Sequence, residues 1–315
     1  MIGRPLVSVA IPCYNHERYI QDCIKSVIGQ DYENIELIII DDGSSDNSVE
    51  KIKEMIPACE ERFVHFEFRH RDNKGLSATL NEAIEWCRGA YYSTIASDDV
   101  LLPKKTSTLL RYMEEDKDVA GIFCGCYILD GNGKKIDSLR APEKLYSFED
   151  IFFRKYNIIA PTQLLRLDCV QCVGGYPENL YVEDWYMWLA LTEKGYKLRV
   201  VDGLLVGYRQ HENNSSKNAL KMHDGRVEVL KYFSENPLQK KAVAINYLFA
   251  SIDFTSISKI KAAKFLFESV SYNKEIIFSP LFASCLLRLV IPRFVFAQAK
   301  KLKCVLVGNS KDIVT

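Results

Sequence analysis

The chain has 315 residues, of which 48% are hydrophobic and 26% are charged. This composition is typical of a folded protein with a sizeable core and excludes a disordered chain. Lys and Arg together number 41, as do Asp and Glu, so net charge gives no reason to expect nucleic acid as a partner. The length fits one large domain with an appendage, or two modest domains.

Ten cysteines are scattered along the chain. The first residues lead straight into a strand-like run without a signal-peptide pattern, so free thiols in a reducing cytoplasm are expected. Two pairs, Cys124-x-Cys126 and Cys169-x-x-Cys172, could be imagined as zinc ligands. Each pair stands alone and the first falls in an apolar run, which favours buried thiols over a zinc site.

The first hundred residues alternate between strand and helix patterns. Apolar runs predict strands at Leu6–Ile11, Ile35–Ile40, Val64–Phe68 and Tyr91–Ile95. Helical spacing predicts helices at Glu17–Gln30, from about Asp46 to Met55, and at Leu76–Cys87. This alternation predicts an α/β fold with a mainly parallel sheet and helices on both faces. Ligands bind such sheets at the carboxyl ends of the strands.

The second part of the chain is less regular. The patterns predict a strand at Val119–Leu129, a helix at Glu183–Lys194, and one or two strands within Tyr196–Tyr208. After about residue 218 the pattern is helical. We therefore predict a catalytic domain over residues 1–217 and a helical C-terminal region over 218–315.

Polar side chains follow three of the four predicted strands in the first hundred residues. They are Pro12-Cys13-Tyr14-Asn15, Asp41-Asp42-Gly43-Ser44-Ser45-Asp46 and Ser97-Asp98-Asp99. Each stretch alone could be a turn or a helix cap. Carboxylates that converge at strand ends repel one another, however, and a divalent metal holding a diphosphate would offset this repulsion. Their oxygen ligands suit Mg²⁺ or Mn²⁺.

These stretches and three further ones resemble the family-2 inverting glycosyltransferases of the GT-A fold. The additional matches are Asn73-Lys74-Gly75-Leu76-Ser77, Gly174-Gly175-Tyr176 and Glu183-Asp184-Trp185. The resemblance covers about residues 5 to 216. It implies a Rossmann-like GT-A domain and a metal-dependent transferase, of the type that assembles bacterial polysaccharides. The donor is expected to be a nucleotide sugar, specifically a UDP-sugar, and the acceptor a saccharide or lipid-linked saccharide.

The resemblance also assigns residues to the donor. It places Pro12, Tyr14 and Asn15 in the nucleotide base pocket and Asp42 in a hydrogen bond to the base, expected to be uracil. Arg71 or Asn73, followed by Gly75, would lie near the base and diphosphate.

For the reacting groups, the resemblance implies that Asp98 contacts ribose or sugar, Asp99 binds the metal and Asp184 is the catalytic base. His211 is expected to contact the metal or the diphosphate, although a surface histidine is an equal alternative. Leu80 departs from the family pattern, because many members have an arginine there.

Transfer from a nucleotide sugar explains the need for these residue types. A metal offsets the charge of the diphosphate leaving group, and a carboxylate on the opposite side deprotonates the attacking hydroxyl. Trp185 and Trp188 could stack on sugar rings or belong to the core. The alternatives are a sugar-phosphate nucleotidyltransferase, which should carry a glycine-rich basic loop after the first strand, and a non-catalytic nucleotide-sugar-binding protein.

The stretch from Lys259 to Lys303 contains nine Lys or Arg, two Glu and several apolar runs. Charges interrupt these runs too often for a transmembrane helix. A basic amphipathic stretch can lie on an anionic membrane surface, and a helical subdomain packed on the core is the alternative. We therefore expect a cytoplasmic protein with a peripheral contact to the inner face of the membrane.

Overall fold

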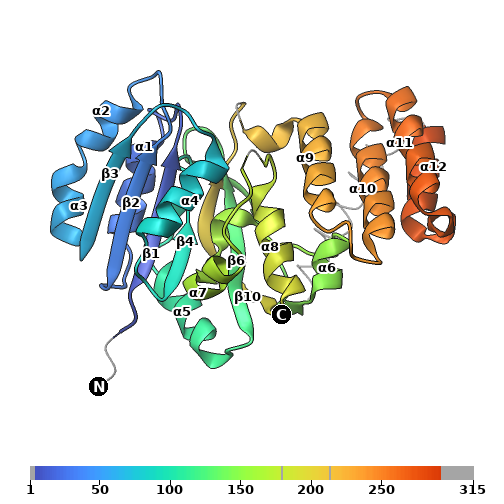
Figure 1. Cartoon of the computed structure of the whole chain (residues 1–315). Coiled ribbons are helices and arrows are strands. Elements are labelled where there is room, and N and C mark those ends of the chain that lie inside the picture. Colours follow the sequence, from blue (N-terminus) through green and yellow to red (C-terminus); the bar gives the residue numbers. More distant parts are fainter. Residues whose placement is uncertain (1–3, 179, 213, 292–315) are drawn as a thin grey trace, which may run out of the picture. The chain divides into compact units, whose positions relative to one another are not determined.

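The computed structural model describes residues 4–178, 180–212 and 214–291 (Figure 1). The chain divides into two compact units, Met1–Lys217 and Asn218–Thr315. The strands of the first unit are β1 Val7–Cys13, β2 Ile35–Asp41, β3 His65–His70, β4 Tyr91–Thr94, β5 Val100–Leu101, β6 Val119–Leu129, β7 Lys135–Leu139, β8 Lys144–Tyr146, β9 Leu164–Arg166 and β10 Lys197–Arg209. Its helices are α1 Ile20–Ile28, α2 Ser48–Lys53, α3 Ile56–Arg62, α4 Leu76–Trp86, α5 Lys105–Glu115, α6 Phe148–Phe152, η1 Ala160–Thr162, α7 Leu167–Cys172, α8 Glu183–Glu193 and η2 Ser215–Lys217.

The strands form one mixed sheet in the order β3-β2-β1-β4-β9-β6-β10-β5, with β7 paired to β6 and β8 paired to β10. Strands β3, β2, β1 and β4 run parallel, whereas β9 is antiparallel to both of its neighbours. The predicted α/β fold with a mainly parallel sheet is confirmed. Most predicted boundaries differ from the observed ones by one to three residues, and the sequence interpretation missed several elements, among them α3 and α5.

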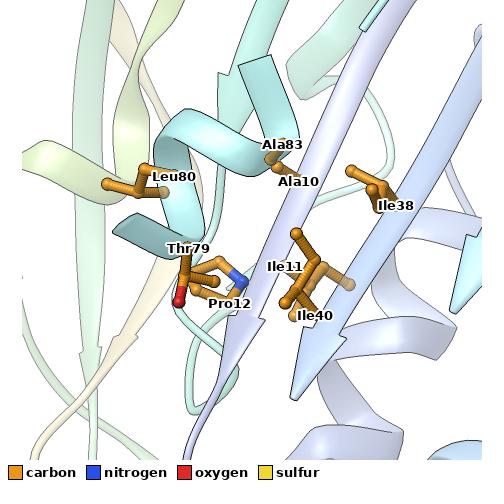
Figure 2. Close-up of a pocket in the computed structure, with 8 residues that line it drawn as sticks. All are labelled: Ala10, Ile11, Pro12, Ile38, Ile40, Thr79, Leu80 and Ala83. Atoms are coloured by element: carbon orange, nitrogen blue, oxygen red, sulfur yellow. The ribbon is translucent and has the colours of Figure 1, made fainter. Parts of the chain in front are cut away.

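Helices cover both faces of the parallel part of the sheet. Successive strand residues point to opposite faces, so Val9, Ile11 and Leu37 pack in one core with Ile24 of α1. On the other face, α4 lies over β1 and β2. Figure 2 shows Thr79, Leu80 and Ala83 of α4 beside the ends of these strands, around a crevice with no room for a water molecule.

Leu80 is buried and lines this apolar crevice. The position at which many family members carry an arginine is therefore part of the packing between α4 and the sheet. Trp185 and Trp188 are also buried in the core, and the indole of Trp185 donates to the carbonyl of Ile151 at 3.1 Å. Core packing is therefore their role, and stacking on sugar rings is not.

The second unit is helical over its described residues, as predicted. Its elements are α9 Ala219–Lys231, α10 Gln239–Phe254, α11 Lys259–Tyr272, η3 Lys274–Phe278 and α12 Pro280–Val290. Residues 292–303 of the predicted basic stretch lie outside the described residues. Within the part of the chain that is described, no helix combines the length and apolar character needed to span a bilayer.

Candidate active site

A cavity of about 720 Å³ lies at the carboxyl ends of β1, β2 and β4, where the sequence places its polar stretches. Most of the predicted site residues line it: Pro12, Tyr14, Asn15, Asp42, Asn73, Gly75, Asp98, Asp99 and His211. Arg71 and Asp184 are not among the lining residues. Segments separated by up to 200 residues in sequence therefore meet around one cavity.

The loops after β1 and β2 are fastened to each other. Asn15 has a left-handed backbone with φ of 55°, an uncommon conformation for a residue with a side chain. Its amide oxygen accepts from the backbone N–H of Ser45 at 2.7 Å, and its own N–H donates to Ser44 Oγ at 2.8 Å. These bonds hold the half-exposed ring of Tyr14 at the cavity.

Asp42 connects the end of β2 to the loop before α4. Its buried carboxylate accepts backbone N–H groups of Lys74 at 2.8 Å and Gly75 at 2.9 Å, and it pairs with the Arg71 guanidinium. Gly43 allows this close approach, because a Cβ there would lie 2.7 Å from the backbone nitrogen of Asn73. Asp42 and Asn73 are thereby held in fixed positions along one side of the cavity.

Arg71 is the first residue of this loop, and its side chain is not among those that line the cavity. Its Nε donates to Glu82 at 2.8 Å and its Nη2 donates to Thr79 at 2.8 Å, in addition to its ion pair with Asp42. These interactions raise the pKa of Arg71 despite its partial burial. The guanidinium thus holds the loop between β3 and α4 against α4.

His16, Asp98 and His211 form a group whose candidate metal-binding atoms all lie within 4.8 Å of one another. Nε2 of His211 lies 2.8 Å from Oδ2 of Asp98, and Nδ1 of His16 lies 2.7 Å from Ser97 Oγ. Burial lowers the pKa of His16, which keeps its imidazole neutral and able to bind a cation. Over the described ranges, no other set of three His, Cys, Asp or Glu side chains is arranged in this way, the cysteine pairs included.

The donor set of this group fits a divalent transition metal. Two imidazole nitrogens and one carboxylate oxygen are a mixed set, whereas Mg²⁺ prefers oxygen ligands and keeps several waters. The sequence interpretation missed His16, although it directly follows Asn15 at the end of the first polar stretch. A histidine after a strand is too common to be diagnostic without knowledge of its neighbours.

Asp99 has different surroundings from Asp98. Its carboxylate is buried, and Oδ1 accepts the backbone N–H of Arg209 at 2.8 Å. Oδ2 has no hydrogen-bond partner within the described part of the chain. Burial and the neighbouring charge of Asp98 raise the pKa of Asp99 well above its ordinary value. Asp99 is therefore bonded toward β10 and lies outside the His16–Asp98–His211 group.

Arg209, at the end of β10, contacts the His16–Asp98–His211 group through the Asp98 backbone and through Tyr19. Its buried guanidinium donates from Nε to the Asp98 carbonyl at 2.8 Å and lies 5.0 Å from the centre of the Tyr19 ring. Tyr19 in turn stacks on His211, with ring centres 5.0 Å apart and planes 23° from parallel. The stack of Arg209, Tyr19 and His211 has no signature in the sequence, because Tyr19 lies about 190 residues before the segment that carries Arg209 and His211.

Glu183 and Asp184 begin α8. Glu183 lines the cavity, and Asp184 Oδ1 accepts the backbone N–H of Trp185 at 2.6 Å. Burial, followed by the charge of Asp184, raises the pKa of Glu183. One of these two adjacent carboxyl groups is therefore favoured in its protonated form.

Sequence comparisons identify relatives along most of this fold. The model of glycosyl transferase family 2 matches residues 8–168. A candidate teichuronic acid biosynthesis glycosyltransferase, TuaG of Bacillus subtilis, is 30% identical over 69% of this chain and 84% of its own. UDP-Glc:alpha-D-GlcNAc-diphosphoundecaprenol beta-1,3-glucosyltransferase WfgD of Escherichia coli is 26% identical over 78% of this chain and 94% of its own.

Solved structures share the fold. TarS 1-349 of S. aureus, in complex with UDP-GlcNAc, superposes with a TM-score of 0.61 at 18% identity, over 85% of this chain and 81% of that one. Mannosyltransferase PcManGT of Pyrobaculum calidifontis, in complex with GDP-Man and Mn²⁺, gives a TM-score of 0.58 at 12% identity, over 91% and 85%. With the family model matching half of its length, the chain belongs to glycosyl transferase family 2 and is a glycosyltransferase of the GT-A fold.

Proposed function

We propose that this glycosyltransferase moves a sugar from a UDP-sugar to a saccharide hydroxyl with inversion at the anomeric carbon. The observation that carries the proposal is the single cavity that joins the β1 and β2 loops, the His16–Asp98–His211 group and Glu183. A nucleotide sugar needs three regions in succession, one for the nucleoside, one for the diphosphate and one for the sugar. The loops, the metal-binding group and Glu183 would supply them in this order. Family membership alone would leave the donor and the stereochemistry open.

The uridine is proposed to lie against the loops after β1 and β2. Pro12, Tyr14 and Asn15 supply one wall, and Asp42 and Asn73 the other. Asp42 already accepts three hydrogen bonds, and a carboxylate has about four lone-pair positions, so one acceptor remains for a base N–H. The names of WfgD and of the TarS complex, which mention UDP-Glc and UDP-GlcNAc, support a uridine donor.

The metal is proposed to be Mn²⁺ rather than Mg²⁺, held by His16, Asp98 and His211. A divalent cation there would offset charge on the diphosphate as the glycosidic bond breaks. We propose Asp98 as the carboxylate ligand in place of Asp99, because Asp98 offers an oxygen within 4.8 Å of both imidazole ligand atoms and Asp99 is not part of that group. Asp99 would then hold the loop between β4 and β5 against β10. The Mn²⁺ in the PcManGT complex supports this choice of ion.

Asp184 is proposed as the base that takes the proton of the attacking hydroxyl. Glu183, with its raised pKa, would hold a proton at neutral pH and offer it as a hydrogen bond within the cavity. Two adjacent carboxyl groups with separated pKa values are a common way to divide such roles. A single displacement with one base gives the proposed inversion.

The acceptor is proposed to be a lipid-linked saccharide, with the protein acting at the cytoplasmic face of the membrane. The WfgD name, which includes a diphosphoundecaprenol acceptor, supports this class. A lipid-linked acceptor must be reached at a bilayer surface, which requires peripheral contact by the enzyme.

A panel of nucleotide sugars with Mn²⁺, monitored for release of the nucleoside diphosphate, tests the function. We expect slow hydrolysis of one UDP-sugar by the wild type and none by Asp98→Ala. Pyrophosphate release from a nucleoside triphosphate and a sugar phosphate would instead identify a nucleotidyltransferase. Binding of UDP-sugars without turnover in any acceptor screen would identify a non-catalytic protein.

A further inference from the structure

Large apolar side chains are exposed on the second unit. Ile260 and Phe278 are each 85% exposed, Val290 is 79% exposed and Phe267 is 74% exposed. Single exposed apolar residues need no explanation, but a cluster of this size marks an interaction surface. These four residues all come from α11, η3 and α12.

The exposed residues lie on defined helix faces. In α12, Ala283, Leu286, Leu287 and Val290 are exposed at the spacing of one helix face, whereas Cys285 is buried. An amphipathic helix normally turns its apolar face to the core. Here a second apolar face of the same helix is exposed within the described part of the chain.

One side of α11 follows a related pattern of exposed residues. Ile260, Ala263, Lys264 and Phe267 are exposed on one side, and Leu266 is buried on the other. This stripe combines apolar residues with a lysine, and further lysines stand beside it at 259 and 261.

The two stripes belong to neighbouring helices. Nζ of Lys259, at the start of α11, donates to the carbonyl of Leu289 at 2.7 Å, near the end of α12. The two helices pack against each other within the second unit (Figure 1). We call the exposed residues of α11, η3 and α12 the outer face of this unit: Ile260, Lys264, Phe267, Phe278, Leu286, Leu287 and Val290.

The outer face lies in a basic part of a chain that is neutral overall. Residues 257–291 contain five Lys or Arg and two Glu, and residues 292–315 add five Lys or Arg and one Asp. The positive charge is therefore concentrated in the same segment as the uncovered apolar residues.

We propose that the outer face binds the surface of an anionic lipid bilayer. Lysines among exposed Ile, Leu and Phe suit this partner, because the apolar groups enter the interface while the ammonium groups meet anionic head groups. A second protein copy fits less well, since lysine is depleted in the cores of protein interfaces. The proposal rests on the proposed function, because it supplies the contact that a lipid-linked acceptor requires.

The experiment is co-sedimentation of the full chain with vesicles of phosphatidylcholine, with and without about one third phosphatidylglycerol. The test variant is Leu287→Glu combined with Val290→Glu. The matched control is Ile136→Glu combined with Leu139→Glu, which changes two exposed apolar residues of β7 in the first unit. Circular dichroism verifies that each variant is folded.

We expect the wild type and the β7 control to bind the anionic vesicles, and the α12 variant to bind at least about tenfold more weakly. Raised salt should weaken binding of the wild type. Equal binding by the α12 variant, or no binding by the wild type, overturns the proposal. So does a wild-type dimer in light scattering that the α12 variant dissociates without any vesicle binding.

Donor hydrolysis without vesicles separates this proposal from the proposed function. The α12 variant should release UDP at the wild-type rate, because its changes lie outside the cavity. If neither the wild type nor any variant hydrolyses a UDP-sugar but vesicle binding is as expected, the proposed donor is wrong and the proposed bilayer contact is retained. If hydrolysis is normal and vesicle binding is absent, only the proposed bilayer contact is wrong.

Discussion

Nε2 of His211 and Oδ2 of Asp98 lie 2.8 Å apart, although 113 residues separate them in sequence. A hydrogen bond at this distance needs a proton on Nε2, because the carboxylate only accepts. A metal at the same nitrogen would need that proton to leave or to move to Nδ1. The pair is therefore a place where a proton and a cation compete.

Removal of either member should weaken metal binding. We expect Asp98→Ala and His211→Ala to lower Mn²⁺ affinity by about 100-fold or more, and His16→Ala by about tenfold. Isothermal titration with Mn²⁺ and UDP measures these changes. Asp202→Asn, an exposed carboxylate on β10, serves as the control that should bind like the wild type. Undiminished affinity in Asp98→Ala, with loss in Asp99→Ala, would return the metal to Asp99.

Arg209 should act as a positioning residue for the same group. Lysine in its place keeps the charge but loses the planar donors that contact the Asp98 carbonyl and lie over Tyr19. We expect Arg209→Lys to lower Mn²⁺ affinity and kcat by about tenfold. The KM for the acceptor should stay nearly constant. Arg199→Lys, on the same strand but in exposed ion pairs, should have little effect. A loss of melting temperature with normal Mn²⁺ affinity would indicate a structural role only.

The two carboxyl groups at the start of α8 should respond differently to amide substitution. Glutamine imitates a protonated glutamate, so Glu183→Gln should retain most activity at neutral pH. Asp184→Asn should lose about 100-fold to 10,000-fold in kcat, because it removes the proposed base. The reverse order of effects would make Glu183 the base, and its raised pKa would then make activity rise with pH through that value.

Lys105 provides a test of stability that is independent of function. Its buried ammonium group donates to Ser93 Oγ at 2.6 Å and to the Gln163 carbonyl at 2.7 Å, and burial lowers its pKa from 10.5 to about 8. Between these two values the unfolded chain binds more protons than the folded chain, so stability rises with pH in this range.

Lys105→Met should lack this gain. From pH 7 to pH 10.5, the stability of the wild type should increase relative to the variant by up to about 3 kcal/mol. Urea denaturation at several pH values measures the difference between the two curves. Parallel curves would show that the lysine titrates alike in both states.

The parallel strands and the polar stretches that follow them could be predicted from sequence, because both depend on local patterns. The apolar run Ile35–Ile40, which only Glu36 interrupts, predicts a buried strand, and β2 occupies nearly the same residues. Short strands such as β9 could not be predicted, since three residues carry no period. The resemblance implies the metal role for Asp99, whereas the group with His16 and His211 contains Asp98. Sequence cannot predict this difference, because adjacent side chains in a turn point in different directions.

The contacts of Arg209 with Asp98 and Asp99 tie two segments that lie about 110 residues apart. The family model matches residues 8–168 and so ends before Glu183, Arg209 and His211. The loops after β1 and β2 and the residues Glu183, Arg209 and His211 belong to the same compact first unit, even though they come from separate stretches. A cation that binds only the assembled group will raise the free energy of unfolding of the whole first unit. Cation binding and unfolding are therefore linked equilibria, so that a higher occupancy of the site makes the first unit more stable.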